Sequence, residues 1–181
     1  SKIEKNIKVK AIAKRKKQEK KNIDHDTLVF NNAKDFLNFD DYDVLVELIG
    51  GDEGVAKEIT FDALRKGKNV VTANKALISK HGVKMIKIAN ANKCRLAFEA
   101  SVAGGIPIIK IANEFLISNK IKKIYGILNG TSNYILSKMY ETKSDFHKIL
   151  KEAQNLGYAE SDPSFDIDGT DTAHKISILS L

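Results

Sequence analysis

Short apolar runs alternate along the first half of the chain with longer stretches that carry an apolar residue every three or four positions. The short runs predict strands at Ile7–Ala13, Asp43–Leu48, Lys68–Thr72 and Arg95–Glu99. The longer stretches predict helices at Lys34–Phe39, Glu53–Lys66 and Lys75–Asn92. Gly67 should end the second of these, and Gly82 is a candidate break in the third. Strands and helices in alternation are typical of a doubly wound α/β fold, in which Asp43–Leu48 would be a buried parallel strand.

The second half of the chain has a different order of elements. A strand with mixed periodicity at Ile121–Leu128 opens a second domain. Helices are predicted from about Pro107, over Ser132–Glu141, over Asp145–Leu156 and from about Asp168. The helix over Asp145–Leu156 should be capped by Ser144 and stopped by Gly157. The last helix is expected to place apolar residues on one side, namely Ala173, Ile176 and Leu179, together with Ser180.

Composition narrows the class of protein. The chain has 181 residues, of which 43% are hydrophobic, enough for a sizeable core. We find no apolar run long enough to span a membrane and no signal-peptide pattern near Ser1. The single Cys94 excludes an internal disulfide and suits a reducing, cytoplasmic compartment. Its place before a strand favours a buried, inert thiol over a nucleophile.

The net charge of +7 raises the question of nucleic acid. Much of the excess lies in Lys8–Lys21, but no aromatic residue interleaves this run and no zinc or helix-turn-helix pattern accompanies it. We therefore expect neither a nucleic-acid nor a membrane partner. Arg15 and its lysine neighbours follow the first strand, where a dinucleotide-binding fold faces the adenine ribose, and basic residues there suit the 2′-phosphate of NADP. The alternative is a solvated basic loop.

Two later strands end in residues that suit a ligand site. Ile49, Gly50 and Gly51 follow Asp43–Leu48, and glycines at a strand's carboxyl end allow close approach by a ligand, although they also suit a tight turn. Thr72 ends the next strand and Lys75 begins the helix after it. We predict cofactor contacts at these positions because ligands bind at the carboxyl ends of parallel strands.

The segment Gly157–Lys175 carries an unusual density of charge: Glu160, Asp162, Asp166, Asp168 and Asp171, and then Lys175. Asp171 and Lys175 stand four apart on one helical face. One interpretation is an exposed ion pair worth about 0.3–0.5 kcal/mol. The other is a lysine whose position and charge are set for proton transfer. An EF-hand is excluded, because Lys175 would occupy the place of its bidentate glutamate.

Five blocks, in order, resemble homoserine dehydrogenases: VELIGG (Val46–Gly51), VVTANKALIS (Val70–Ser79), FEASVAGGIPII (Phe98–Ile109), GILNGTSNYIL (Gly126–Leu136) and GYAESDPSFDIDGTDTAHK (Gly157–Lys175). The resemblance implies a partial Rossmann-type NAD(P)-binding domain at residues 1–104. It implies part of an α+β substrate and dimerisation domain at residues 105–181.

The resemblance also implies an activity, the NAD(P)-dependent interconversion of L-homoserine and L-aspartate 4-semialdehyde on the route to threonine and methionine. Glu160 and Asp171 would hold the substrate's amino group, with Asp166 and Gly157 also on the substrate side. Lys175 would pass the hydroxyl proton, and Lys75 would assist from the nucleotide side. Since a neighbouring carboxylate favours the charged ammonium, Lys175 is more plausible as the proton donor in aldehyde reduction.

Family members hold a monovalent cation, Na⁺ or K⁺, mostly through backbone carbonyls. The matching positions here are Glu99, Val102, Gly104 and Ile106. The family also implies a homodimer formed through the sheet that contains Ile121–Leu128. Two alternatives remain, a catalytically silent dimerising fragment and a related semialdehyde dehydrogenase that would use Cys94.

The sequence departs from the family at its start. The phosphate-binding pattern G-x-G-x-x-G is absent, whereas in the family a strand, that loop and most of a helix would precede Ser1. The last residues lie in an apolar helix, before strands that the family uses to close its substrate domain. We therefore expect these residues alone to bind NADPH weakly, with NADP favoured over NAD in the full chain.

Overall fold

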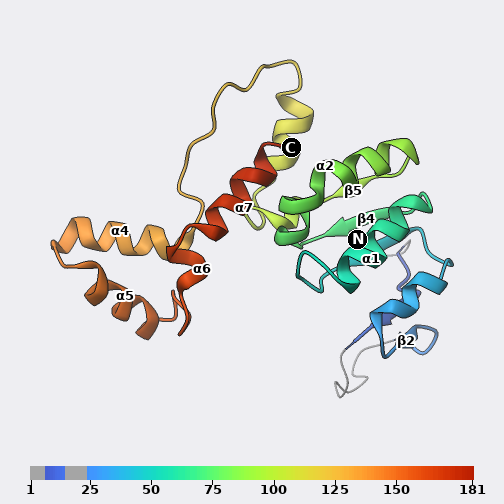
Figure 1. Ribbon diagram of the computed structural model, residues 1–181, viewed down its shortest axis with the longest axis horizontal. Coiled ribbons are helices and arrows are strands. Elements are labelled where there is room, and N and C mark those ends of the chain that lie inside the picture. Colours follow the sequence, from blue (N-terminus) through green and yellow to red (C-terminus); the bar gives the residue numbers. More distant parts are fainter. Residues whose placement is uncertain (1–6, 15–23) are drawn as a thin grey trace. The chain divides into compact units, whose positions relative to one another are not determined.

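The structure is a computed structural model that describes residues 7–14 and 24–181. It divides into two compact units, Ser1–Ala97 and Phe98–Leu181 (Figure 1). The domain boundary expected from the sequence, between residues 104 and 105, stays a prediction. No helix in the described ranges is both long enough and apolar enough to cross a lipid bilayer.

Parallel strands form the framework of the first unit. Strands β3 (Val44–Glu47), β4 (Asn69–Thr72) and β5 (Leu96–Ala97) make one sheet in that order, with Val46 opposite Val71. Strands β1 (Ala11–Ala13) and β2 (Leu28–Phe30) form a second parallel pair. The predicted α/β fold with parallel sheets is confirmed. The strands are shorter than predicted, and β2 was not predicted at all.

Helices α1 (Val55–Arg65) and α2 (Lys75–Ala91) connect the strands of the larger sheet, and a 3₁₀ helix, η2 (Ala33–Asn38), precedes it. The stop at Gly67 is confirmed, because Gly67 has φ of 72° and the next amide returns to the Ala63 carbonyl at 2.9 Å. The expected break at Gly82 is wrong, since α2 runs unbroken through this buried residue. Burial of the helix face offsets the cost of about 1 kcal/mol that glycine carries in a helix.

The prediction that β3 is a fully buried strand is wrong. Leu45 and Glu47 are buried, whereas Val46 on the opposite face is 58% exposed. Alternate residues of a strand point to opposite faces, and α1 packs against β3, β4 and α2 on one of them. The apolar run in the sequence did not reveal that only this face is covered.

The second unit is mostly helical. Its elements are η3 (Glu99–Ser101), α3 (Ile108–Lys110), the π-helical turn η4 (Ile111–Phe115), α4 (Gly130–Thr142), α5 (Phe146–Asn155), α6 (Ser164–Ile167) and α7 (Thr170–Leu179). Helices α4 and α5 pack around Ile135, Ile149, Ala153 and Ala159. The cap of α5 is Asp145 and not Ser144, because the Asp145 carboxylate accepts the Lys148 amide at 3.1 Å. Gly157, with φ of 78°, ends α5 as predicted.

The predicted strand at Ile121–Leu128 is not a strand in this structure. The segment is an irregular coil between η4 and α4 (Figure 1), and its apolar side chains point outward, with Tyr125 80% exposed. A strand forms only when its amides and carbonyls pair with a neighbour. Within the described residues this segment has no such partner.

The last helix forms as predicted, but the side that carries its apolar residues is not the buried side. Ala173 and Ile176 of α7 are exposed, whereas Asp171 and Ile178 are the buried residues. The Asp171 carboxylate can lie on the buried side of α7 because it has hydrogen-bond partners there. Its partners are the basis of the candidate site in this unit.

Candidate active site

Lys175 and Asp171 form a largely buried pair within the second unit. The Lys175 Nζ lies 2.8 Å from Asp171 Oδ2 and 2.6 Å from the carbonyl oxygen of Leu128. The lysine side chain is 21% exposed and the aspartate side chain 5%. An ion pair on a helix surface is solvated on most sides, so this burial argues against that interpretation. The ammonium is held by two acceptors, one on its own helix and one on the chain before α4.

Asn129 joins the two carboxylates of this cluster. Its Nδ2 donates to Asp166 Oδ1 at 2.8 Å and to Asp171 Oδ2 at 2.9 Å. Its Oδ1 accepts the Ser132 amide at 2.8 Å and so caps α4. The resemblance to the family placed the turn that contains Asn129 by the substrate, but the sequence did not predict that Asn129 joins the two carboxylates. The available signal was an asparagine directly before a helical stretch, which indicates a cap but not the second role.

The Thr131 hydroxyl lies between two acceptors, Asp166 Oδ2 at 3.1 Å and the Tyr158 carbonyl oxygen at 2.7 Å. Its single proton can be donated to one of them at a time, and the shorter distance is to the Tyr158 carbonyl. Gly157 shapes the turn that places this carbonyl. Of the predicted substrate residues, the structure therefore brings Asp166 and Asp171 to Lys175.

Glu160 stands apart from this cluster. Its side chain is exposed and makes no hydrogen bond or ion pair with any described residue. Only its backbone carbonyl is engaged, by Gln154 Nε2 at 3.1 Å. Its predicted contact with the substrate's amino group stays a prediction.

In the first unit, the loop after β3 is organised by Glu47. The Ile49 and Gly50 amides donate to Glu47 Oε1 at 2.7 and 3.2 Å. Gly50 and Gly51 have φ of 88° and 81°, values that other residues adopt only at a cost. The glycines therefore serve a tight turn, and the predicted cofactor contacts at Ile49, Gly50 and Gly51 stay predictions.

The turn after β4 is tied to the same carboxylate. The Thr72 hydroxyl is buried, donates to Glu47 Oε2 at 2.5 Å and accepts the Asn74 amide at 2.9 Å. Asn74 caps α2 by accepting the Leu77 amide at 3.1 Å, and Lys75 is the first residue of that helix. Because Asn74 fixes the start of α2, it also fixes the position of the Lys75 backbone. Arg15 lies outside the described residues, so its predicted role stays a prediction.

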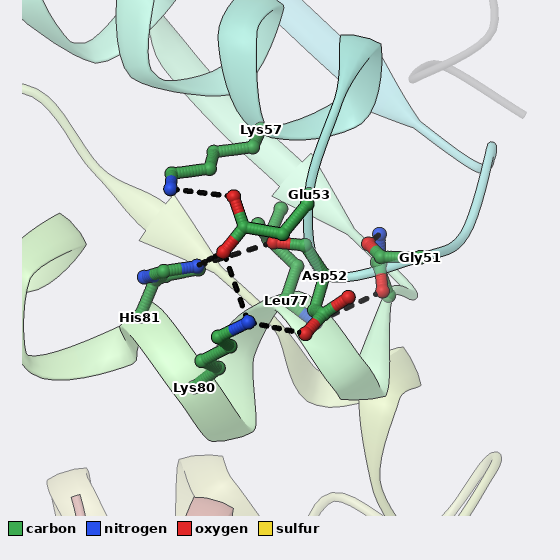
Figure 2. Close-up of polar contacts among 8 residues, drawn as sticks. Gly51, Asp52, Glu53, Lys57, Leu77, Lys80 and His81 are labelled. Atoms are coloured by element: carbon green, nitrogen blue, oxygen red, sulfur yellow. Dashed lines mark hydrogen bonds and ion pairs between the residues drawn. The ribbon is translucent and has the colours of Figure 1, made fainter.

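The loop continues into a cluster of charges that fixes it to α2. Figure 2 shows Glu53 lying among Lys57, Lys80 and His81, with Asp52 beside Lys80. Lys80 pairs with Asp52 at 2.7 Å and with Glu53 at 2.9 Å. Hydrogen bonds from Lys57, Lys80 and His81 lower the pKa of Glu53 to about 2.

The predicted cation loop lies in the second unit, at Glu99, Val102, Gly104 and Ile106. The Glu99 carboxylate accepts the amides of Ile109 and Lys110 at 2.8 and 2.9 Å, so it caps the following helix. The carbonyls of Glu99 and Ile106 each accept one amide, at 3.4 and 2.8 Å. A carbonyl oxygen has two lone pairs and can also contact a cation. The hydrogen bonds thus leave both oxygens able to contact a cation, and the cation stays a prediction.

Cys94 does not belong to either group of site residues. It is buried, its Sγ lies 3.6 Å from the Leu64 carbonyl, and burial raises the pKa of its thiol. A raised pKa disfavours the reactive thiolate. In the described ranges, no three or more histidine, cysteine or acidic residues are grouped so as to hold a metal ion.

Parallel strands connected by helices, with glycines at the carboxyl end of β3, are the architecture of dinucleotide-binding α/β proteins. Two family profiles match the chain. The one described as the NAD-binding domain of homoserine dehydrogenase matches residues 1–99, and the one described as homoserine dehydrogenase matches residues 107–181. The chain belongs to the homoserine dehydrogenase family, whose members are NAD(P)-dependent oxidoreductases.

Individual relatives agree with this assignment. The homoserine dehydrogenase of Neisseria gonorrhoeae is 55% identical over 140 residues, which are 77% of this chain and 32% of the relative. That of Bacillus subtilis is 49% identical over 146 residues, 81% of this chain and 34% of the relative. The chain thus spans about a third of the length of the curated relatives that it matches.

Solved structures give the same result. A homoserine dehydrogenase from Thiobacillus denitrificans has a TM-score of 0.77 at 50% identity, covering 84% of this chain and 35% of that one. A hyperthermophilic archaeal homoserine dehydrogenase in complex with NADPH has a TM-score of 0.74 at 34% identity, covering 82% of this chain and 46% of that one.

Proposed function

We propose that this chain supplies much of the catalytic region of a homoserine dehydrogenase, which interconverts L-homoserine and L-aspartate 4-semialdehyde. The observation that carries the proposal is the Lys175 ammonium, held between the Leu128 carbonyl and the buried Asp171 carboxylate. A fixed ammonium can donate a proton to the substrate's carbonyl oxygen, and the carboxylates beside it can bind the substrate's amino group.

The nicotinamide, when bound, supplies or accepts the hydride. The chain's own residues manage the proton and the substrate's charge. In the reduction, negative charge develops on the aldehyde oxygen, and Lys175 Nζ donates a proton to it. In the oxidation the same nitrogen receives the hydroxyl proton. Asn129 keeps Asp166 and Asp171 at fixed positions, and these carboxylates together with Glu160 bind the substrate's ammonium group.

The cofactor is assigned to the carboxyl ends of β3 and β4, at Ile49–Gly51, Thr72 and Lys75. NADP is favoured over NAD by the basic sequence at Arg15. An archaeal homoserine dehydrogenase with a similar fold has been solved in complex with NADPH, which supports a nicotinamide cofactor. A monovalent cation would be held by the carbonyls of the 99–106 loop, where it would stabilise the turn. The protein is assigned to the cytoplasm with its biosynthetic relatives.

A homodimer is assigned to the segment Ile121–Leu128. This coil exposes apolar side chains, and among the described residues its backbone forms no hydrogen bond to other backbone groups, as at an unpaired edge of a sheet. Pairing with the same segment of a second chain would cover the apolar side chains and give the backbone groups hydrogen-bond partners. Such symmetric contacts are usual in homodimers.

The activity is tested in the protein at its full native length. The assay follows the formation of NADPH from NADP⁺ by its absorbance, with L-homoserine as the substrate. Lys175→Ala should lower kcat by about 10²–10⁴-fold, the range for loss of a general acid, and leave NADPH affinity nearly unchanged. Lys138→Ala is the matched control, because Lys138 pairs with Glu141 on a helix surface at 3.2 Å. Normal turnover by the Lys175 variant would refute the proton-transfer role.

Two further variants separate the remaining roles. Glu160→Ala should raise KM for homoserine more than it lowers kcat, because a contact to the ammonium group exists in ground and transition states alike. Lys75→Ala should weaken NADPH binding as well as turnover, since Lys75 lies on the nucleotide side. An inactive Lys75 variant beside an active Lys175 variant would move proton transfer to Lys75.

The same assays decide between the proposed function and its alternatives. A catalytically silent dimerising protein would bind neither NADPH nor homoserine. A semialdehyde dehydrogenase with a catalytic cysteine would lose activity in Cys94→Ser, whereas the buried thiol with its raised pKa leads us to expect unchanged turnover.

A further inference from the structure

Glu47 is a buried carboxylate for which the sequence analysis gave no role. It is 1% exposed at the carboxyl end of β3, and no lysine, arginine or histidine of the described residues forms an ion pair with it. Burying an unpaired charge is expensive, so such groups persist where several hydrogen bonds satisfy them. The hydrogen-bond partners of Glu47 therefore indicate its role.

Its partners come from two different turns. Oε1 accepts the amides of Ile49 and Gly50, and Oε2 accepts the Thr72 hydroxyl. The Asn74 side chain approaches Oε1 at 3.5 Å and donates to the Gly51 carbonyl at 2.7 Å. One carboxylate thus links the loop after β3 to the start of α2.

These contacts set the geometry of the residues assigned to the cofactor. The loop after β3 turns with two consecutive positive φ angles, at Gly50 and Gly51, and its Ile49 and Gly50 amides donate to Glu47. Those amides are consequently not available to an anionic phosphate. Asn74 is fixed both as the cap of α2 and as a partner of the loop, and Lys75 follows it directly.

We propose that Glu47 is the positioning residue of the cofactor side of this site. It holds the Ile49–Gly51 loop and the Lys75 end of α2 in one arrangement, in which the loop meets the nicotinamide–ribose part of the cofactor and not its phosphates. The proposal rests on the proposed function for the identity of the cofactor. Glu47 itself touches neither cofactor nor substrate.

The test uses Glu47→Ala and Glu47→Gln in the protein at its full native length. The Gln variant keeps one acceptor oxygen for the Ile49 and Gly50 amides, and its amide group can donate to the Thr72 hydroxyl. Thr60→Val is the matched control, because Thr60 is equally buried but its hydroxyl donates only within α1, to the Ala56 carbonyl at 2.7 Å.

Three measurements are compared: NADPH dissociation constant by fluorescence titration, kcat and KM for homoserine, and hydrogen exchange of the Ile49 and Gly50 amides. In Glu47→Ala, NADPH affinity and kcat should each fall by about 10–100-fold, the scale for slight misplacement of site residues. KM for homoserine should stay within about threefold, because the substrate cluster lies in the other unit. The two amides should exchange faster in this variant alone, and Glu47→Gln should restore most of the NADPH affinity.

A purely structural role predicts a different result. Glu47→Ala and Thr60→Val would then lower the melting temperature to similar extents and leave NADPH affinity and the two amides unchanged, which would overturn the proposal. If the parent protein bound NADPH but did not oxidise homoserine, the proposed function would fail. Loss of NADPH affinity and amide protection in Glu47→Ala would even then support Glu47 as the positioning residue.

Discussion

The bridging role of Asn129 makes a quantitative prediction for stability. Asn129→Ala removes the cap of α4, which costs about 1 kcal/mol of unfolding free energy. It also removes two hydrogen bonds to carboxylates, at 2.8 and 2.9 Å. Hydrogen bonds to charged groups contribute about 1.5 kcal/mol or more each. The sum is about 4 kcal/mol, a large part of the stability of a small domain.

Two variants separate the cap from the bridge. Asn129→Ser keeps an oxygen that can cap the helix but is too short to reach both carboxylates, so it should lose about 3 kcal/mol. Asp145→Ala removes only a cap, that of α5, where the carboxylate accepts the Lys148 amide. Since that side chain makes no bridge between carboxylates, its loss should cost about 1 kcal/mol.

Urea unfolding followed by tyrosine fluorescence measures these differences. The chain has no tryptophan and five tyrosines, of which all but Tyr42 lie in the second unit. The signal therefore reports mainly on the unit that contains Asn129. Equal costs for Asn129→Ala and Asp145→Ala, within about 0.5 kcal/mol, would show that Asn129 is only a cap and would refute the reasoning.

Three further predictions concern other parts of the chain. The pKa of Glu53 is 4.5 before folding and about 2 after it, so its carboxylate stabilises the protein above pH 4.5 and loses this effect between pH 4.5 and 2. The urea midpoint should consequently fall less steeply over that window in Glu53→Gln than in the parent. Tyr125→Asp should shift sedimentation of the native protein from the proposed dimer towards monomer, because it would place charge in the proposed apolar interface; an unchanged dimer would contradict that interface. Cys94 should react with a thiol reagent only at the rate of unfolding, since it is buried and its thiol pKa is raised; fast reaction in the native state would disprove this burial.

The sequence by itself determined the features that depend on neighbours along the chain. Helix periodicity located α1, α2, α4 and α5, and glycines with positive φ ended α1 at Gly67 and α5 at Gly157. The spacing of Asp171 and Lys175 placed both side chains on one helical face, and the structure joins them at 2.8 Å. Hydrogen bonds between residues three or four apart form within one turn, so local sequence is enough to predict them.

Only the tertiary structure decided which distant groups meet. Asn129 reaches Asp171 across 42 positions, and Glu47 reaches Thr72 across 25. Covering helices decided that one face of β3 is buried while Val46 remains exposed, and the lack of a partner among the described residues left 121–128 as coil. Burial and strand pairing depend on surfaces brought together from far along the chain, and the apolar pattern of one segment is the same with or without such a partner.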